Sequence, residues 1–492
     1  MTIPPRTPVV VGVGTVLQRE DDPARALEPC ALMVEALNRA ADDAGSVALL
    51  KNADKIAVPR GFWKYPDPAR LVASAIGADR ARTEVSEVGV LQTTVLARAA
   101  QDIAEGNCDI VLVAGGEARH RARRAKAAGE SEELSTQPDG TAPDQVLRPS
   151  GDILSPFEIR AGLLMPVGAY AMMDNALRAH EGQDLDAHRD DVAQVWSELS
   201  RAAVENADAW RPEYVDPKTI RDPSPQNAMM NFPYTKLHNS NWNVDQASGI
   251  VFCSAETAER LGIPRERWVF PLSVAESNHM TFLTERRELH RSPGFAYAAE
   301  RALSRAAASA ADVAHLELYS CFPSAIRIQQ REIGLDPAAP ATVTGGMPFA
   351  GGPLNNFVLQ AMAQMVRVLR NDPKSLGMVN AVSGLMTKQG VSLWSTEPRG
   401  PGFLYEDVSE ATAAAIESVV VDGDLPSQAR IASYTVSYVG DTPHTAIVLC
   451  DRDDGSRSLR ACPDPKLALQ LTLEEGCGRK IRFFGTDRAE LL

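Results

Sequence analysis

Continuous apolar runs alternate with amphipathic segments along the first part of the chain. The runs, which are typical of strands buried on both faces of a sheet, are PVVVGVG at 8–14, KIAVP at 55–59 and DIVLVAGG at 109–116. Helical spacing of apolar residues extends from a capped start at Asp22-Pro23 to Ala44, and it returns over 90–106. Strands that alternate with helices predict a largely parallel sheet covered by helices.

The same order of strands and helices returns after residue 268. Its strand-like runs are VFPLSVA at 269–275, HLELYSCF at 315–322 and GMVNAVSG at 377–384. The helical segments between them are 295–309, 324–334 and 357–369. Two stretches with one element order indicate an internal duplication.

Two other regions break this rhythm. Residues 118–267 hold the basic run 119–124, a polar loop at 129–150 and several helices. The basic run is either a solvated helix face or a contact to a nucleotide phosphate. After about residue 400, alternating runs predict strands. We therefore predict four parts, namely a first half (1–117), an insertion (118–267), a second half (268–400) and a small β-rich domain (401–492).

Composition narrows the functional class. The 492 residues are 44% hydrophobic and 23% charged, with a formal net charge of −14, which is typical of a soluble globular protein and argues against nucleic-acid binding. No apolar run is long enough for a membrane span, and the first residues lack the pattern of a signal peptide, so we expect a cytoplasmic protein. The seven cysteines form no CxxC pair, so we expect no disulfide framework and no metal site.

Five phrases, in order, carry a resemblance to the thiolase superfamily, and in particular to its sterol-carrier-type members and thiolase-like proteins of type 1. They are IAEGNCDIVLVAGGEA, LMPVGAYAMMDNALRAH, YTKLHNSNWNVDQASGIVFCSAE, ELYSCFPSAI and GGMPFAGGPLNN. The resemblance covers residues 5–400. It implies duplicated βαβαβαββ halves in a five-layer αβαβα core, with a helical insertion and an additional C-terminal domain.

The resemblance places the nucleophilic cysteine of thiolases near Gly89, where this chain has no cysteine within ten residues. The GHP loop of the family corresponds to Gly351-Gly352-Pro353, which lacks the histidine. The Gly352 amide could still contribute to an anion site, and Asn355 and Asn356 are the nearest polar side chains. Both asparagines are alternatively helix caps. Standard thiolase activity is therefore not expected.

The remaining site residues are substitutes for family residues. Tyr319 stands where relatives carry His or Asn, and it is either an acid/base or oxyanion donor or a packed tyrosine. Cys321 is either a catalytic thiol or an inert buried one. Lys388, in the segment that carries a second cysteine in many thiolases, is either a phosphate or carboxylate ligand or a surface residue. His238 is either a site residue or a structural histidine.

Three functions stay open at this point. The chain is an acyltransferase-like enzyme on acyl-CoA with rewired chemistry, a retro-aldol lyase on a β-hydroxyacyl-CoA, or a non-catalytic acyl-CoA or lipid-binding protein. The resemblance implies coenzyme A thioester as substrate or ligand, a role in lipid metabolism, no further cofactor, and a possible homodimer.

Overall fold

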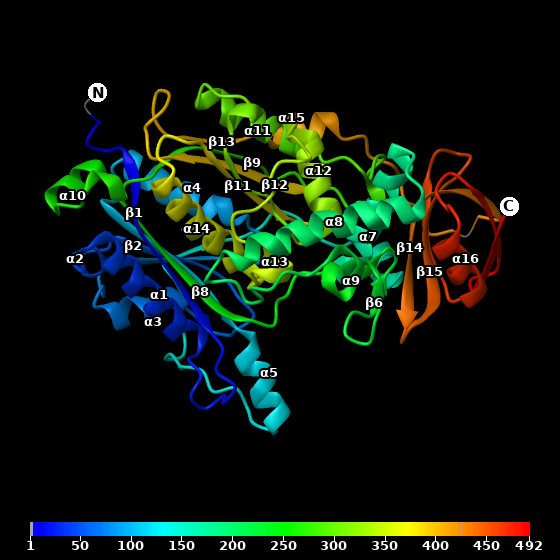
Figure 1. The fold of residues 1–492 in the computed structure, drawn as a ribbon, viewed down its shortest axis with the longest axis horizontal. Helices are drawn as coiled ribbons and strands as arrows, with labels where there is room; N and C mark the ends of the chain where they lie inside the picture. The colour runs from blue at the N-terminus through cyan, green and yellow to red at the C-terminus, as the bar shows by residue number, and fades with distance from the viewer. Residues whose placement is uncertain (1–2, 425) are drawn as a thin grey trace.

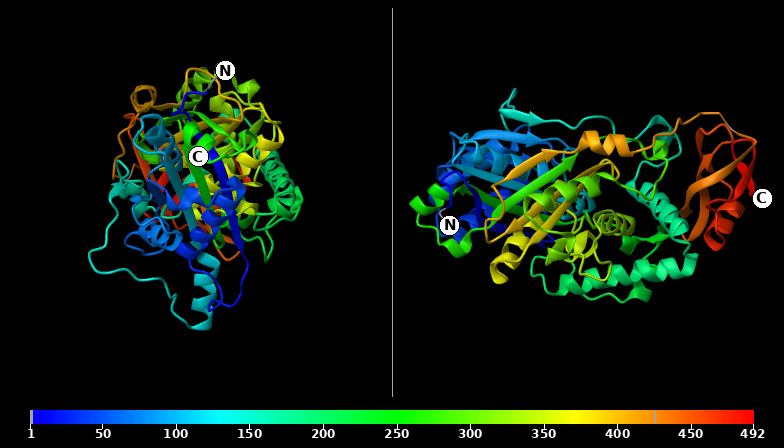
Figure 2. Two further views of the ribbon diagram at one scale, coloured as in Figure 1. Left: turned by 90° about the vertical axis from the view of Figure 1, so that its left-hand side faces the viewer. Right: turned by 90° about the horizontal axis from the view of Figure 1, so that it is seen from above.

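The protein is a stack of five layers with a separate domain at one end (Figure 1). The computed structural model describes residues 3–424 and 426–492. Two sheets lie face to face with helices between them and helices on both outer sides. The C-terminal domain lies at the end of the long axis opposite the first sheet (Figure 2). The expected fold class, a five-layer αβαβα core with an added β-rich domain, is confirmed.

The first sheet has six strands in the order β1-β8-β4-β2-β3-β5. They are β1 (Pro8–Gln18), β8 (Asp245–Ser254), β4 (Ile110–Ala118), β2 (Lys55–Pro59), β3 (Arg82–Ser86) and β5 (Gln145–Leu147). β8 runs antiparallel to β1 and β4, whereas β4, β2, β3 and β5 run parallel. Helices α1 (Pro29–Ala44) and α3 (Pro68–Ile76) cover the outer face.

The second sheet repeats this topology. Its order is β10-β11-β12-β9-β13, with β10 (His315–Glu317), β11 (Gly377–Ser383), β12 (Lys388–Ser395), β9 (Phe270–Ser277) and β13 (Leu404–Asp407). β12 is antiparallel to β9 and β11, and β11 is parallel to β10, so these four strands match β8, β1, β4 and β2. Helices α11 (Gly294–Arg305) and α12 (Pro323–Ile333) lie on the outer side.

This match moves two of the expected boundaries. β8 falls in the range assigned to the insertion, but it is the last strand of the first sheet. The insertion therefore lies within the first half, between β4 and β8. The chain leaves the sheet after β4 and returns as β8, which pairs antiparallel with both β1 and β4. β13 likewise joins the second sheet beyond residue 400.

Helices α4 (Gln92–Ala104) and α14 (Phe357–Asn371) form the middle layer and contact both sheets. Their apolar faces meet Val10, Val113, Phe252 and Trp394 in one fully buried cluster. Such clusters stabilise a fold by roughly 1.5–3 kcal/mol per buried large side chain. This central core fixes the start of α4 relative to both sheets.

The insertion consists mainly of α5 (Arg119–Ala128), α7 (Pro166–Glu181), α8 (Leu185–Val204) and α9 (Pro217–Arg221). The C-terminal domain contains β14 (Gln428–Val439), β15 (Thr442–Asp451), β16 (Arg457–Cys462), α16 (Pro465–Leu473), β17 (Lys480–Phe484) and β18 (Arg488–Leu491). Two strands of the insertion, β6 (Met229–Asn231) and β7 (Tyr234–Thr235), extend its sheet. The shorter helices are α2 (Ala48–Lys51), α6 (Pro156–Arg160), α10 (Ala255–Arg260), α13 (Gly346–Phe349) and α15 (Ser409–Ala415).

One predicted helix start differs. Asp22-Pro23 does not begin α1, because the backbone N–H groups of Arg25 and Ala26 both bond to the Asp22 carbonyl in an isolated turn. The helix begins at Pro29, whose fixed φ suits a first helical position. Across the described residues, none of the helices combines the length and the apolar character of a membrane span.

Candidate functional site

Gly89 lies in the turn between β3 and α4, at the carboxyl edge of the parallel strands, where α/β sheets commonly bind ligands. Its backbone has φ +104°, which disfavours any residue with a side chain. A Cβ atom there would lie 2.9 Å from Cβ of Pro149. The position that the resemblance assigns to the thiolase nucleophile therefore disfavours a side chain in this chain.

The side chain of Lys388 reaches this same turn. Its Nζ donates to the carbonyl oxygens of Gly89, at 3.3 Å, and of Ser150, at 3.0 Å. Lys388 is only 2% exposed, and burial lowers the pKa of its ammonium group. The structure thus brings two predicted site residues together, and Lys388 is not the surface residue of the alternative interpretation.

A buried carboxyl group holds the segment that precedes the glycine loop. Glu317, at the end of β10, accepts hydrogen bonds from the backbone N–H groups of Val343 and Thr344, each at 2.9 Å, and from the hydroxyls of Thr342 and Thr344. Burial raises the pKa of Glu317 to about 7. These bonds fix the position of Gly345, the N-cap residue of α13.

The glycine loop itself has no free amide at the expected position. The N–H of Gly352 donates to the carbonyl of Asn241 at 2.8 Å, so the expectation that it contributes to an anion site needs correction. The preceding Gly351 has φ +103°, and the side chain of Gln246 lies where its Cβ would be. The loop is a packed turn against the start of β8 and the residues just before it.

The two asparagines have different environments. Asn355 donates through Nδ2 to the carbonyl of Arg60 at 2.9 Å and so joins the loop to the end of β2. Asn356 is the N-cap residue of α14, but its side chain makes no capping bond. It is 2% exposed, and both its amide atoms are without a hydrogen-bond partner among the described residues. Neither asparagine is a side-chain helix cap.

Tyr319 and Cys321 lie together after β10. Tyr319 is partly buried and packs edge-on against Phe357 with ring centroids 6.1 Å apart. Burial raises the pKa of its phenol well above the usual value, and the neighbouring Cys321 adds to this shift. Burial also raises the pKa of the Cys321 thiol to about 12. At neutral pH both groups keep their protons, so Tyr319 can donate a hydrogen bond and Cys321 lacks thiolate character.

His238 has a structural role. Its Nδ1 accepts a hydrogen bond from the backbone N–H of Thr235 at 3.1 Å and lies 2.9 Å from the Thr235 hydroxyl. Burial lowers the pKa of His238 to about 3. The histidine is therefore neutral and caps a short turn between the rings of Trp196 and Tyr234.

A titratable group that the sequence did not single out borders the first turn of α4. Glu276, at the end of β9, is fully buried and accepts hydrogen bonds from the hydroxyls of Thr93, Thr94 (2.8 Å) and Tyr405 (3.0 Å). Burial raises the pKa of Glu276 to about 7. A carboxyl group with such a pKa can exchange its proton near neutral pH. No motif marks it, because a lone glutamate at a strand end has no signature.

An exposed aromatic pair was also missed. Phe62 and Trp242 are 44% and 39% exposed, and their ring centroids are 5.4 Å apart. The guanidinium carbon of Arg119, from the predicted basic run, lies 4.9 Å from the first ring and 5.3 Å from the second. Three distant segments contribute this cluster, so no sequence window contains it.

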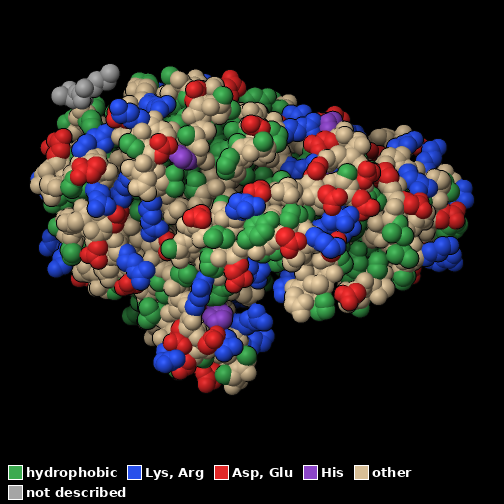
Figure 3. All heavy atoms as spheres, viewed as in Figure 1, with side chains coloured by type: hydrophobic (Ala, Val, Ile, Leu, Met, Phe, Trp, Pro, Cys, Tyr) green, Lys and Arg blue, Asp and Glu red, His purple; other side chains and the backbone are tan. Residues whose placement is uncertain are grey.

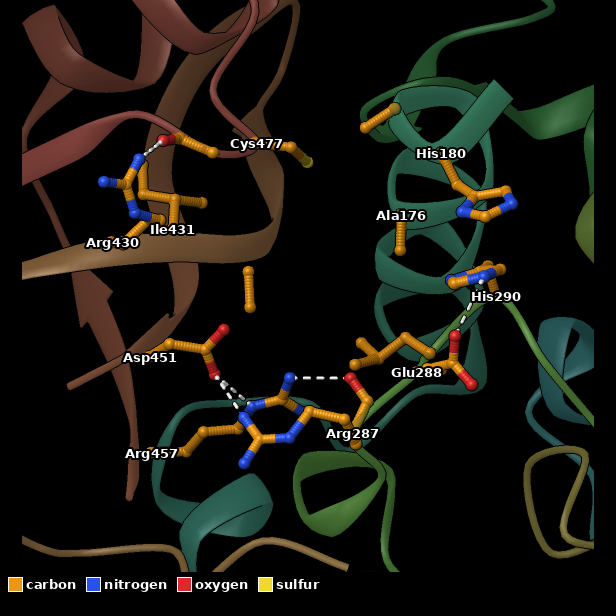
Figure 4. A pocket seen from close by; sticks show the side chains of 14 residues that line it. Ala176, His180, Arg287, Glu288, His290, Arg430, Ile431, Asp451, Arg457 and Cys477 are labelled. Carbon is orange, nitrogen blue, oxygen red and sulfur yellow. Dashed lines mark hydrogen bonds and ion pairs between the residues drawn. The ribbon is translucent and has the colours of Figure 1, made fainter. Parts of the chain in front are cut away.

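A cavity of about 380 Å³ lies elsewhere, between α7 and the C-terminal domain (Figure 4). On one side His180 and His290 are stacked with ring centroids 4.0 Å apart. On another, Asp451 is held by Arg457 at 2.7 Å and by Arg287 at 3.5 Å. None of the predicted site residues lines this cavity. Within the described ranges, no cluster of three His, Cys, Asp or Glu residues could hold a metal ion.

One solved structure matches the whole chain, and others match four fifths of it. A monomeric SCP2-thiolase like protein type 1 from Mycobacterium smegmatis is 28% identical, with a TM-score of 0.83 and full coverage of both chains. An Ltp2-ChsH2(DUF35) aldolase is 18% identical over 80% of this chain and 99% of that one, with a TM-score of 0.60. The dimeric peroxisomal thiolase of Saccharomyces cerevisiae is 15% identical over the same shares, with a TM-score of 0.57. No model of a known protein family and no curated protein sequence matches.

Proposed function

This chain has the fold of the thiolase superfamily, and on that premise we propose that it binds an acyl-CoA thioester without cysteine-dependent acyl transfer. The ligand lies at the carboxyl edge of the first sheet, beside the second half. The observation that carries the proposal is the pairing of Lys388 with the Gly89 carbonyl at the place of the family's nucleophile. A buried ammonium group now occupies the surroundings in which a thiolate would be activated.

The other positions agree with this proposal. Acyl transfer through a thioester needs a thiolate and a base that activates it. Cys321 has a pKa of about 12, the glycine loop has no histidine, and His238 is neutral and engaged by Thr235. Retention of the scaffold without these groups favours recognition of the thioester over its cleavage.

Calorimetric titration with acetyl-CoA and longer acyl-CoA esters, together with a thiolysis assay, tests the proposal. We expect saturable binding and no thiolysis above the uncatalysed rate. A Cys321→Ala variant serves as the control for hidden thiol chemistry. Thiolysis by the wild-type protein that this variant abolishes would contradict the proposal, as would the absence of heat with every ester.

A retro-aldol lyase is the second candidate, and one observation favours it. The hydroxyl of Tyr319 has no hydrogen-bond partner among the described residues, and the side chain is partly exposed. A phenol that stays protonated can donate to the carbonyl oxygen on which charge develops during aldol cleavage. Incubation with a β-hydroxyacyl-CoA would release aldehyde or ketone, and Tyr319→Phe would slow the release at least tenfold. Equal rates would remove Tyr319 from the mechanism.

A further inference from the structure

We propose that Phe62, Trp242 and Arg119 form a subsite that stacks the adenine ring of the CoA thioester and binds its adjoining phosphates. This inference rests on the proposed function and names the part of the ligand that the cluster recognises. Nucleobases stack on exposed aromatic rings, and arginine adds both a stacking plane and hydrogen bonds to phosphate.

The cluster is built in advance of any ligand. The backbone N–H of Phe62 donates to Oε1 of Glu117 at 2.8 Å, and the backbone N–H of Arg119 donates to the carbonyl of Val244 at 3.0 Å. Burial raises the pKa of Glu117 to about 8, so this carboxyl is mostly protonated at pH 7 and does not repel a phosphate. The two rings also contact each other and the Arg119 guanidinium before any ligand binds, so a stacking base has little conformational freedom left to remove.

The position of the cluster suits the long arm of coenzyme A. Phe62 follows β2 and Arg119 follows β4, so both lie at the same carboxyl edge of the sheet as Gly89, which follows β3. Trp242 directly follows Asn241, whose N–H bonds to Met347 and whose carbonyl accepts the Gly352 N–H. The aromatic pair is thus held against the glycine loop.

The charges of α5 complete the subsite. Arg121 and Arg124 of the basic run form ion pairs with carboxylates, at 3.7 and 3.5 Å. Arg119 and Arg123 form none among the described residues, and their spacing of four puts them on one helix face. Figure 3 shows basic and acidic side chains side by side around α5, at the lower, protruding end of the molecule. The N-terminus of α5, at Arg119, also attracts anions through the positive end of the helix dipole.

Three probes separate this subsite from the thioester site. They are acetyl-CoA, adenosine 3′,5′-bisphosphate and S-acetyl-pantetheine, which lacks the nucleotide. We expect Trp242→Ala to weaken binding of the first two by about tenfold to a hundredfold and to leave S-acetyl-pantetheine unchanged. Arg119→Gln is expected to weaken the bisphosphate and to reduce the salt dependence of its binding.

Phe484→Ala is the matched control, because Phe484 is 50% exposed in the C-terminal domain. It should change none of the three affinities. If the wild-type protein binds acetyl-CoA and Trp242→Ala binds it equally well, the subsite is refuted and the proposed function stands. If the bisphosphate binds through Trp242 and S-acetyl-pantetheine does not bind, the subsite stands and the thioester site fails. Binding of none of the probes overturns both.

Discussion

The ammonium group of Lys388 donates a hydrogen bond to the carbonyl oxygen of Gly89, and it does so from a side chain that is 2% exposed. Burial of a lysine costs free energy unless its three N–H donors are satisfied. The carbonyl of Ser150 supplies a second acceptor, so Lys388 joins the loop after β5 to the turn before α4. The place that the resemblance assigns to the nucleophile is thereby part of a packed structural junction.

Restoring a cysteine at this junction is not expected to restore thiolase chemistry. Gly89→Cys forces a side chain onto a backbone with φ +104° and against Pro149, so we expect a loss of about 1–3 kcal/mol in the free energy of unfolding and no thiolysis. Urea denaturation and a thiolysis assay measure the two effects. Gly129→Cys, at a helix end with open space around its Cβ, is the control and should cost less. Thiolysis by Gly89→Cys would show that the surrounding machinery survives.

The cysteines of the native protein should be unreactive at pH 7.5. Cys321 is 8% exposed and its pKa is about 12, and burial likewise raises the pKa of Cys477 to about 12. Because the thiolate is the reacting form, a disulfide reagent should modify fewer than one thiol per chain within minutes, and seven after unfolding in urea. Mapping of the modified peptides by mass spectrometry identifies any exception. Rapid modification of Cys321 would reopen thiol chemistry at this site.

Glu317 should make stability depend on pH in a defined direction. Its pKa is about 7 in the folded protein and 4.5 as the ordinary value, so its stabilising contribution is complete below pH 4.5 and is lost as the pH rises toward 7. Glu317→Gln stays neutral but offers fewer acceptors to Thr342, Val343 and Thr344, which costs about 1–3 kcal/mol. The free energy of unfolding of the variant should therefore lie further below that of the wild type at pH 5 than at pH 8.

Urea titrations of wild type and Glu317→Gln at the two pH values measure this difference directly. Contributions from Glu276 and Glu117, whose pKa values burial also raises, cancel because both proteins contain them. The exposed Glu300 provides the control substitution, Glu300→Gln. A deficit that does not change with pH would mean that Glu317 does not titrate in this range.

The chain is expected to be a monomer, in contrast to the possible homodimer suggested by the thiolase resemblance. β5 covers the edge of β3, and Asp144 fastens it by accepting from the backbone N–H of Thr83 at 2.8 Å. A short edge strand of three residues offers little backbone for pairing with another chain. Light scattering after size-exclusion chromatography should give the mass of one chain. Asp144→Ala frees the β3 edge and should promote self-association, whereas Asp139→Ala in the same exposed loop should not.

Pattern and resemblance predicted the layers of the fold, because the layers depend on local runs of apolar residues. The apolar strands β1 and β4 and the helix α14 stand where their sequences indicate. β5 was not predicted, because its three residues lie in a polar loop and acquire strand geometry only by pairing with β3. The place of β8 was misjudged because its partners lie more than a hundred residues earlier in the chain.

The site was harder to predict than the fold, because its properties arise from burial and from long-range contacts. Lysine is usually a surface residue. Lys388 becomes a buried hydrogen-bond donor only because β12 packs against the loop at Ser150. Tyr319 was a plausible acid/base by type, but burial moves its pKa away from neutrality. Phe62 and Trp242 come together through the sheet edge, which no local pattern encodes.

The docking of the C-terminal domain has a consequence for how the chain folds and for how it can be divided. Asn175 of α7 donates to the carbonyl of Tyr434 at 3.0 Å, Ser433 donates to the carbonyl of Met172 at 2.6 Å, and Asn231 pairs with Ser437. These bonds lie across a buried boundary, so removal of the domain would leave polar groups of the insertion without partners. We therefore expect the last ninety residues to unfold together with the insertion, and a truncation near residue 400 to destabilise α7.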